Sequence, residues 1–126
     1  MELPDDLLSA IDQTRARVHL RLPWWLRPFL MRGVVGLTLG RSVYMAAGSL
    51  HAGADRLREE LEALLWHELA HVAQINRLGL LRFYWRYAGE YVRHRRAGLP
   101  AAEAYRNISF EQQALAAERA RGMLDV

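Results

Sequence analysis

The sequence predicts an α+β fold in which a short β-hairpin lies between an N-terminal helix and a series of further helices. Two observations support this prediction. Apolar residues recur at helical spacing in several long segments, whereas residues 34–47 contain two short apolar runs separated by a Gly-Arg pair. The chain has 126 residues, of which 52% are hydrophobic, so it can bury a core of its own as a single domain.

Residues 1–33 are expected to form an N-terminal helix and a cover over the domain, and residues 34–126 its core. Apolar side chains recur every three or four positions from Leu7 to Val18, which predicts one helix over residues 5–18. The segment that follows this helix is rich in proline and tryptophan. We expect it to pack over the rest of the domain.

The two apolar runs at residues 34–39 and 43–47 are predicted to pair as an antiparallel hairpin. Gly40 and Arg41 lie between them, and glycine at the first turn position suits a type II′ turn. The hairpin forms a small sheet beside an open groove. Its edge offers backbone groups to which an extended peptide could add as a further strand.

Four helices are predicted after the hairpin, at residues 55–77, 81–97, 100–106 and 109–122. Asp55 is the expected N-cap of the first and longest helix, and Gly79 lies just past its end. Ser109, with Gln112 three residues later, matches a capping box for the last helix, and Gly122 marks its end.

The chemistry of the sequence lies on the longest helix, where residues 67–71 read His-Glu-Leu-Ala-His. His67 and His71 are one helical turn apart on one face, so both imidazoles can reach one ion. Zn²⁺ is the predicted ion, because it accepts neutral imidazole and commonly takes three protein ligands and a water. Since the chain has no cysteine, these ligands must be histidines and carboxylates. Glu68 is turned by about 100° from His67 and reaches the metal-activated water instead, which makes it the predicted general base.

The apolar pattern of the helix places this motif in the core. On a helical wheel, Glu68 and His71 fall within the apolar stripe, and His67 falls at its edge. A buried carboxylate without a partner costs on the order of several kcal/mol, so a metal with its water is the simplest explanation. Two core histidines bonded to backbone, beside an ion-paired glutamate, are the alternative.

A downstream glutamate is predicted to complete the site. Gln74 and Arg77 stand where an extended motif would place a glycine and a third histidine, so that version is excluded. Glu111 is preferred, because the first turn of a helix favours a carboxylate. Glu118, two turns further along the same face, could orient one of the histidines. The candidates for third ligand are Glu90, Glu103, Glu111, Glu118 and His94.

Three segments resemble known zinc peptidases. Residues 64–74 resemble the metal helix of gluzincin-type HExxH zinc metallopeptidases. Residues 35–40 and 104–114 are similar to a bacterial peptidase-like domain family that is often found near extracellular contractile injection systems. The size and the order of the elements also resemble the minigluzincins, single-domain peptidases in which a glutamate helix follows the metal helix.

The resemblance implies a zincin-like fold and a zinc-dependent metallopeptidase that acts on a peptide or protein substrate. It implies His67, His71 and Glu111 as metal ligands and Glu68 as the base. Many gluzincins carry an aspartate soon after the third ligand to orient a histidine. This chain has Ala114 and a leucine at those positions, so it differs from that pattern in a residue that would orient a ligand.

A peptidase also needs a hydrogen-bond donor for the oxyanion of its intermediate. Tyr105, six residues before Glu111, is the predicted donor and second catalytic residue, with Tyr91 and His94 as alternatives. Two other functions compete with a peptidase. One is a zinc-binding but catalytically silent module that serves an assembly or accompanies a toxin; the other is a basic binding protein without a metal.

Residues 82–96 mix arginine with aromatic side chains, as proteins that bind single-stranded nucleic acid do. However, Phe83, Tyr87 and Tyr91 form one stripe at helical spacing. We therefore expect a core face there and no nucleic-acid partner.

The sequence does not determine the cellular compartment of the protein. Trp24 and Trp25 could contact a membrane surface, since tryptophan favours the interface between lipid and water. The acidic N-terminus is unlike a secretory signal, and no apolar segment is long enough to cross a bilayer. We expect a cytoplasmic protein or one exported without a cleavable signal, of undefined oligomeric state.

Overall fold

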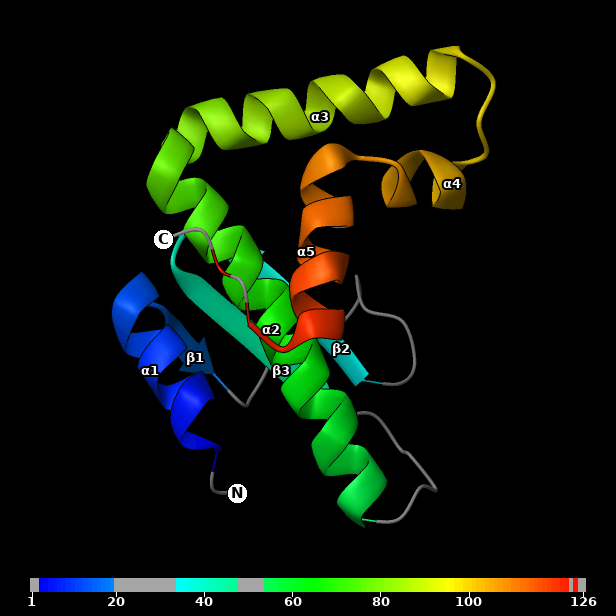
Figure 1. Cartoon of the computed structure of the whole chain (residues 1–126). Helices are drawn as coiled ribbons and strands as arrows, with labels where there is room; N and C mark the ends of the chain where they lie inside the picture. The colour runs from blue at the N-terminus through cyan, green and yellow to red at the C-terminus, as the bar shows by residue number, and fades with distance from the viewer. Residues whose placement is uncertain (1–2, 20–33, 48–53, 123, 125–126) are drawn as a thin grey trace.

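The computed structural model describes residues 3–19, 34–47, 54–122 and 124, and these show the predicted α+β class (Figure 1). The predicted cover and the membrane contact of Trp24 and Trp25 lie outside the described residues. The elements are α1 (Asp5–Thr14), β1 (Arg17–His19), β2 (Val34–Leu39), β3 (Ser42–Ala47), α2 (Ala54–Leu78), α3 (Leu80–Arg96), α4 (Ala101–Arg106) and α5 (Ser109–Ala120).

The predicted hairpin is present as β2 and β3, but the sheet is larger than predicted. Gly40 has a φ of 62°, as the first position of the predicted turn requires, and Leu39 pairs with Ser42 across it. On its other side β3 pairs in parallel with β1, with Val18 opposite Val43. The described strands therefore form a mixed three-stranded sheet in the order β1-β3-β2.

The predicted extent of the first helix was wrong at its C-terminal end. The helix ends at Thr14, where Arg15 adopts a left-handed conformation and the N–H of Ala16 donates to the carbonyl of Ile11. Val18, assigned by its spacing to the helix, lies in β1 instead. An apolar residue at that position fits both patterns, and the partner strand that decides between them lies more than twenty residues away.

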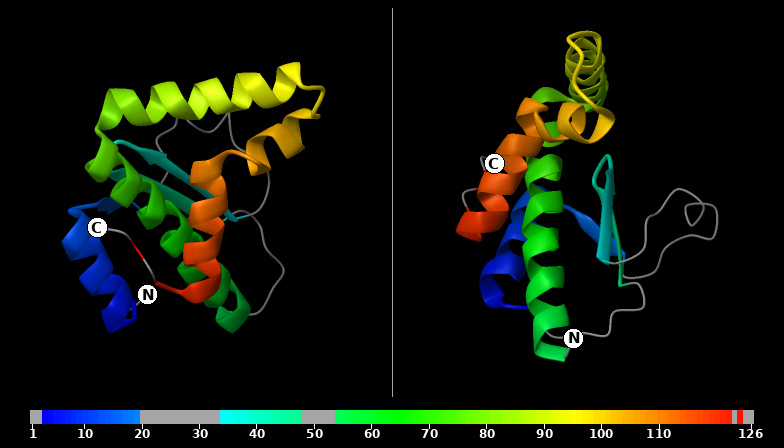
Figure 2. Two further views of the ribbon diagram at one scale, coloured as in Figure 1. Left: turned by 45° about the horizontal axis from the view of Figure 1, so that its top comes forward. Right: turned by 90° about the vertical axis from the view of Figure 1, so that its right-hand side faces the viewer.

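Helix α2 lies between the sheet and α5, as Figure 2 shows. Towards the sheet, Leu65, Leu69 and Val72 pack in one buried cluster with Val43 and Met45. Burial on this side agrees with the predicted core position of the motif.

On the opposite side of α2, Ala70 packs with Ala114 and Ala117 of α5 in a second buried cluster. The two helix backbones can approach each other closely at this contact, because an alanine side chain ends at Cβ. The helix is consequently buried on two sides around its middle, whereas the apolar stripe alone predicted one buried side.

The predicted capping box of the last helix was wrong. Ser109 is the first helical residue, and both its N–H and its hydroxyl donate to the carboxylate of Glu90 on α3. Gln112 donates to the carbonyl of Arg106 instead of closing the box. A carboxylate from another helix thus binds the start of α5, which a local sequence pattern does not reveal.

Helix α3 leaves the end of α2 and extends along one end of the molecule, with α4 beneath its far half (Figure 1). Phe83 is buried with Ile75 and Phe110, and Tyr87 and Tyr91 pack against this cluster. The predicted core face of α3 is therefore confirmed. None of the described helices combines the length and the apolar character that a bilayer-spanning helix needs.

The close approach of α2 and α5 generates a first prediction. Ala114→Leu adds a bulky side chain at a fully buried contact and should lower the free energy of unfolding by about 1–3 kcal/mol. Urea denaturation measures the change. Ala116→Leu, at an exposed position of the same helix, is the matched control and should cause no loss. Equal stabilities of the two variants would contradict tight packing at Ala114.

Candidate metal centre

Two helices bring the predicted ligands together. His67 and His71 lie one turn apart on α2, and Glu111 lies in the first turn of α5, which crosses α2 at the alanine contact. Each residue offers a ligand atom, and these atoms all lie within 4.8 Å of one another. His71 and Glu111 are buried, and His67 is partly buried. The three residues can hold a metal ion.

The carboxylate of Glu111 faces both imidazoles at once. Its Oε1 lies 2.9 Å from Nε2 of His67, and its Oε2 lies 3.1 Å from Nε2 of His71. Two ligand atoms at about 2.0–2.1 Å from one tetrahedral ion lie ~3.3 Å apart, close to both distances. The donor set of two imidazoles and one carboxylate is one that zinc commonly binds.

The other nitrogen of each ring also faces an oxygen. Nδ1 of His71 donates to Oε1 of Gln74 at 2.9 Å, and Nδ1 of His67 lies 3.5 Å from Oε1 of Glu118. A neutral imidazole carries only one N–H, so it cannot donate to acceptors on both sides. The His71 ring, which is bonded to Gln74 and also faces Glu111, therefore needs either an added proton or a cation between its Nε2 and Glu111.

Gln74 connects α2 to the start of α5 by hydrogen bonds. Its Nε2 donates to the carbonyl of Phe110, the residue before Glu111, and to Oε1 of Gln113. Because the amide nitrogen makes these two bonds, its oxygen must be the atom that faces His71. One side chain thereby sets the tautomer of His71 and the approach of Glu111.

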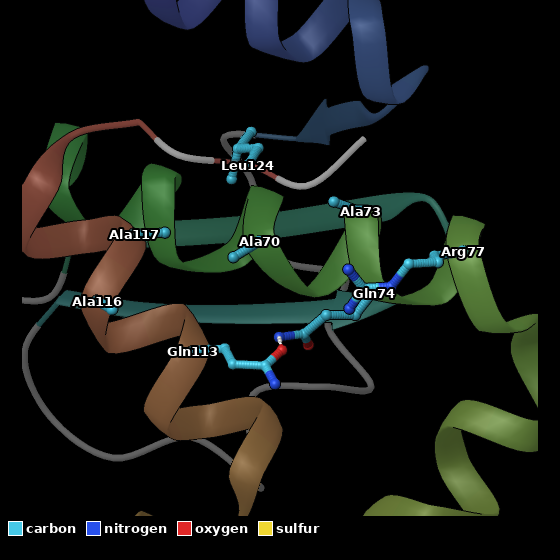
Figure 3. Close-up of a pocket in the computed structure, with 8 residues that line it drawn as sticks. All are labelled: Ala70, Ala73, Gln74, Arg77, Gln113, Ala116, Ala117 and Leu124. Atoms are coloured by element: carbon cyan, nitrogen blue, oxygen red, sulfur yellow. Dashed lines mark hydrogen bonds between the residues drawn. The ribbon is translucent and has the colours of Figure 1, made fainter.

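A pocket of about 260 Å³ lies beside Gln74, between α2 and α5, and Figure 3 shows its lining. Ala70, Ala73, Gln74 and Gln113 contribute to its walls, but the three candidate ligands do not. This pocket therefore does not adjoin the candidate ligands, and Glu68 lies on the opposite face of α2.

Glu68 is held by the edge strand of the sheet. The hydroxyl of Thr38 on β2 donates to Oε2 of Glu68 at 2.5 Å. The hydroxyl of Tyr84 on α3 donates in turn to the carbonyl of Thr38 and accepts from the N–H of Gly40. Strand, base and α3 are thus joined by hydrogen bonds beside the candidate ligands.

A pocket of about 230 Å³ opens on this side. It is lined by the candidate base, by two candidate ligands and by hydroxyl groups from three elements. These residues are Thr38, Glu68, His71, Tyr87, Tyr105 and Glu111. The pocket thus joins the predicted base to the predicted oxyanion donor.

Electrostatics in the pocket favour an ionised Glu111 and protonated tyrosines. Burial opposes the ionisation of Glu111, but hydrogen bonds from His67, His71 and Tyr87 outweigh it and lower its pKa well below the usual range. Burial and the neighbouring Glu111 raise the pKa of both Tyr87 and Tyr105. Both hydroxyls therefore remain hydrogen-bond donors at neutral pH.

The pKa of His71 depends on its burial and on the same carboxylates. Burial alone would lower its pKa, but the hydrogen bond and charge of Glu111, with the charge of Glu68, raise it overall. Within the described part of the chain, neither buried carboxylate forms an ion pair with an arginine. A divalent cation would supply the positive charge that this cluster attracts.

The structure places the other candidate ligands elsewhere. Glu90 binds Ser109, and His94 faces the carbonyl of Asn107. Glu103 is exposed on α4. Glu118 faces His67 from the side away from Glu111, as an orienting residue would.

The structure also places the three candidate oxyanion donors in different surroundings. Tyr105 lines the pocket with Glu68. Tyr91 packs against the second core cluster, and His94 bonds to Asn107 outside the pocket.

Sequence reasoning missed three residues of the site. Thr38, Gln74 and Tyr87 contact Glu68, His71 and Glu111, respectively. Gln74 stands three residues after His71 on one helix, so helical spacing alone could have suggested it. Thr38 and Tyr87 gave no such signal, because each reaches its partner across elements.

The bond from His71 to Gln74 generates a second prediction. Gln74→Leu removes the acceptor for Nδ1 and should weaken Zn²⁺ binding by about 10- to 100-fold, because ligand orientation is lost. Competition with a chromophoric chelator measures the affinity. Gln113→Leu, which removes only a partner of Gln74, is the control and should bind nearly as well as wild type. Unchanged affinity in Gln74→Leu would exclude the orienting role.

No protein-family model, no curated protein and no solved structure matches this chain. The resemblance of the motif to gluzincins, to minigluzincins and to the domain family found near contractile injection systems therefore stays a prediction. The functional assignment rests on the residues of the candidate centre and on their geometry.

Proposed function

We propose that this chain is a zinc-dependent metallopeptidase with a zincin-like arrangement of metal helix, edge strand and glutamate helix. The single observation that carries the proposal is the convergence of both imidazoles on Glu111, together with the hydrogen bond of the second His71 nitrogen to Gln74. Both nitrogens of His67 and of His71 face oxygens, and the pair of Nε2 atoms converges on Glu111. A cation between these atoms relieves the conflict that a neutral ring cannot resolve.

His67, His71 and Glu111 would hold the ion, and zinc suits two imidazoles and a carboxylate better than harder ions do. Zinc bound there would supply a Lewis acid and would lower the pKa of a water molecule into the neutral range. The remaining chemistry belongs to the side chains around it. Gln74 and Glu118 keep Nδ1 of each ring engaged, so that Nε2 is presented for coordination.

Glu68 is the proposed general base. It follows His67 directly in the chain and lines the same pocket as His71 and Glu111. Thr38 holds its Oε2, which fixes the carboxylate and leaves Oε1 to take the proton of the attacking water. The same carboxylic acid can then return this proton to the leaving amine.

Tyr105 is the proposed donor to the oxyanion. It reaches the pocket from α4 and is 46% exposed, so a substrate can approach it. Its raised pKa keeps its proton in place at neutral pH. Tyr87 donates to Oε2 of Glu111 and therefore positions a proposed ligand instead of contacting substrate.

The proposed substrate is an extended peptide or protein segment that lies along β2. In a hairpin with a two-residue turn, Leu39 and Leu37 bond to β3, so Gly36 and Thr38 direct their backbone groups outward. Tyr84 already occupies the carbonyl of Thr38. A peptide added as a strand would therefore pair with Gly36 and with the N–H of Thr38.

A zinc-binding but catalytically silent module is the second candidate. One observation favours it: the hydroxyl of Thr38 donates to Oε2 of Glu68 at 2.5 Å, a short bond that lowers the basicity of the carboxylate. In that case the metal would stabilise the packing of α2 and α5, and the chain would serve an assembly or accompany a toxin.

The base and the third ligand are tested by a pair of variants. Glu68→Gln should lower kcat on a mixed peptide library by about 10²–10⁴-fold while zinc remains bound, because only proton transfer is lost. Glu111→Ala should lose zinc as well. Elemental analysis and a hydrolysis assay monitored by mass spectrometry give the two measurements.

The outcomes separate the candidate functions. Stoichiometric zinc without any hydrolysis in wild type would favour the silent module. A wild-type protein that takes up no metal would remove both zinc functions and leave the basic binding protein. Full activity of Glu68→Gln would exclude Glu68 as the base.

Tyr105→Phe should lower kcat by about 10²-fold with little change in KM, since a donor that acts only on the developing oxyanion is removed. Steady-state kinetics on one cleaved peptide measures both constants. Tyr91→Phe is the control, because Tyr91 packs in the core cluster outside the pocket. A similar loss in both variants would indicate a general effect on folding and not a role of Tyr105.

A further inference from the structure

Helix α3 carries a second apolar stripe, turned by about 130° around the helix from its core face. At 100° per residue, Leu81, Trp85, Ala88 and Val92 fall within about 60° of one another. Leu81 is 85% exposed and Trp85 is 83% exposed, and Ala88 and Val92 are also exposed. We call these four residues the outer stripe. Large apolar side chains exposed to this degree and aligned on one face mark an interaction site.

The position of α3 makes the outer stripe accessible as a ridge. The helix lies along one end of the molecule, and its inner side faces α4 and the end of α2 (Figures 1 and 2). Phe83 and Tyr87 on that inner side belong to the core cluster and to the candidate pocket. The outer stripe therefore points away from every described element that packs against α3.

Arginines border the outer stripe, four of them along one side and Arg95 on the other. All five are exposed, and they carry the net positive charge of the helix. They are Arg82, Arg86, Arg93, Arg95 and Arg96. The single acidic residue of α3, Glu90, binds Ser109 and is directed towards α5.

We propose that the outer stripe and its bordering arginines form a docking surface for an anionic lipid membrane. Apolar and aromatic side chains on one face, with arginines beside them, are the pattern of helices that lie in the membrane interface. Tryptophan favours this interface, where its ring is buried and its N–H stays hydrated. The arginines match the negative charge of acidic headgroups.

The shape of the surface favours a membrane over a folded protein partner. The outer stripe is one residue wide and lies on a convex helix, so it offers a ridge instead of a groove. A fluid lipid surface can close around such a ridge, whereas a protein would need a matching groove. The contact would insert Leu81, Trp85 and Val92 to a shallow depth with the helix axis parallel to the membrane.

A pocket beside the outer stripe suits the headgroup of an acidic lipid. It measures about 500 Å³ and is lined by Trp85, Arg86, Gly89, Glu90, Arg93 and Ser109. Arg86 and Arg93 are two turns apart and can approach one phosphate from either side, beside the indole of Trp85. Glu90 also lines this pocket, where its carboxylate accepts hydrogen bonds from the N–H and the hydroxyl of Ser109.

This surface is independent of the proposed metal chemistry, because it contains none of His67, His71 and Glu111. Its consequence for the candidate centre is geometric. Tyr84 and Tyr87 line the candidate pocket from the same helix, so docking through α3 would hold that pocket close to the membrane surface.

Sedimentation with lipid vesicles tests the proposal. The wild-type chain should bind vesicles of phosphatidylcholine with about 30% phosphatidylglycerol and should not bind phosphatidylcholine alone; added salt should weaken the binding. Leu81→Ser with Trp85→Ser should weaken it at least about tenfold. Arg86→Gln with Arg93→Gln should weaken it about fivefold for each arginine neutralised.

Matched controls use exposed residues of the same kind on other elements. Leu8→Ser changes an apolar side chain that is 49% exposed on α1 and should leave vesicle binding unchanged. Arg58→Gln with Arg119→Gln removes two exposed charges from α2 and α5. Far-UV circular dichroism and urea midpoints identify any variant that has lost its fold.

Four results would overturn the proposal. The first is equal binding by wild type and the Leu81, Trp85 variant, and the second is a loss caused only by Trp24→Ala with Trp25→Ala. The third is a dimer in solution that Trp85→Ser dissociates, without vesicle binding, which would assign the ridge to a second copy of the chain. The fourth is binding of a single-stranded oligonucleotide, but not of vesicles, that requires Trp85.

Discussion

The contact between α2 and α5 is the constraint on which the candidate centre depends. Ala70, Ala114 and Ala117 let the two helices approach closely, and this approach brings Glu111 to within 2.9–3.1 Å of both imidazoles. A larger side chain at the contact would separate the carboxylate from the histidines. Because ligand atoms must meet within a few tenths of an ångström, the packing of small residues has the same importance here as the ligands themselves.

Neighbouring side chains determine which nitrogen of each imidazole faces Glu111. Gln74 and Glu118 engage the Nδ1 atoms and leave the Nε2 atoms facing Glu111. The contacts that can orient the two imidazoles thus come partly from α2 itself, one turn after His71, and partly from the C-terminal half of α5.

Helix α3 contributes side chains both to the candidate pocket and to an exposed surface. Its inner face supplies Phe83, Tyr84 and Tyr87, which close the core and line the candidate pocket beside the edge strand. Its outer face holds the exposed apolar stripe and the arginines. One helix therefore links the proposed peptidase site with the proposed membrane surface, and the orientation of one fixes that of the other.

By itself, the sequence determined the features that depend on local spacing: four of the five described helices within a few residues, the hairpin turn at Gly40, and the pairing of His67 with His71 on one helical face. Tertiary structure alone decided the features that depend on distant neighbours. Val18 joins a strand because β3 offers it an edge, and Ser109 binds Glu90 in place of a local cap. Glu111 was one of several candidate ligands until helix packing brought it to the histidines, and Thr38 and Tyr87 joined the site in the same way. Periodicity shows which face of an element is apolar, but the element that covers this face is set by contacts between residues far apart in the chain.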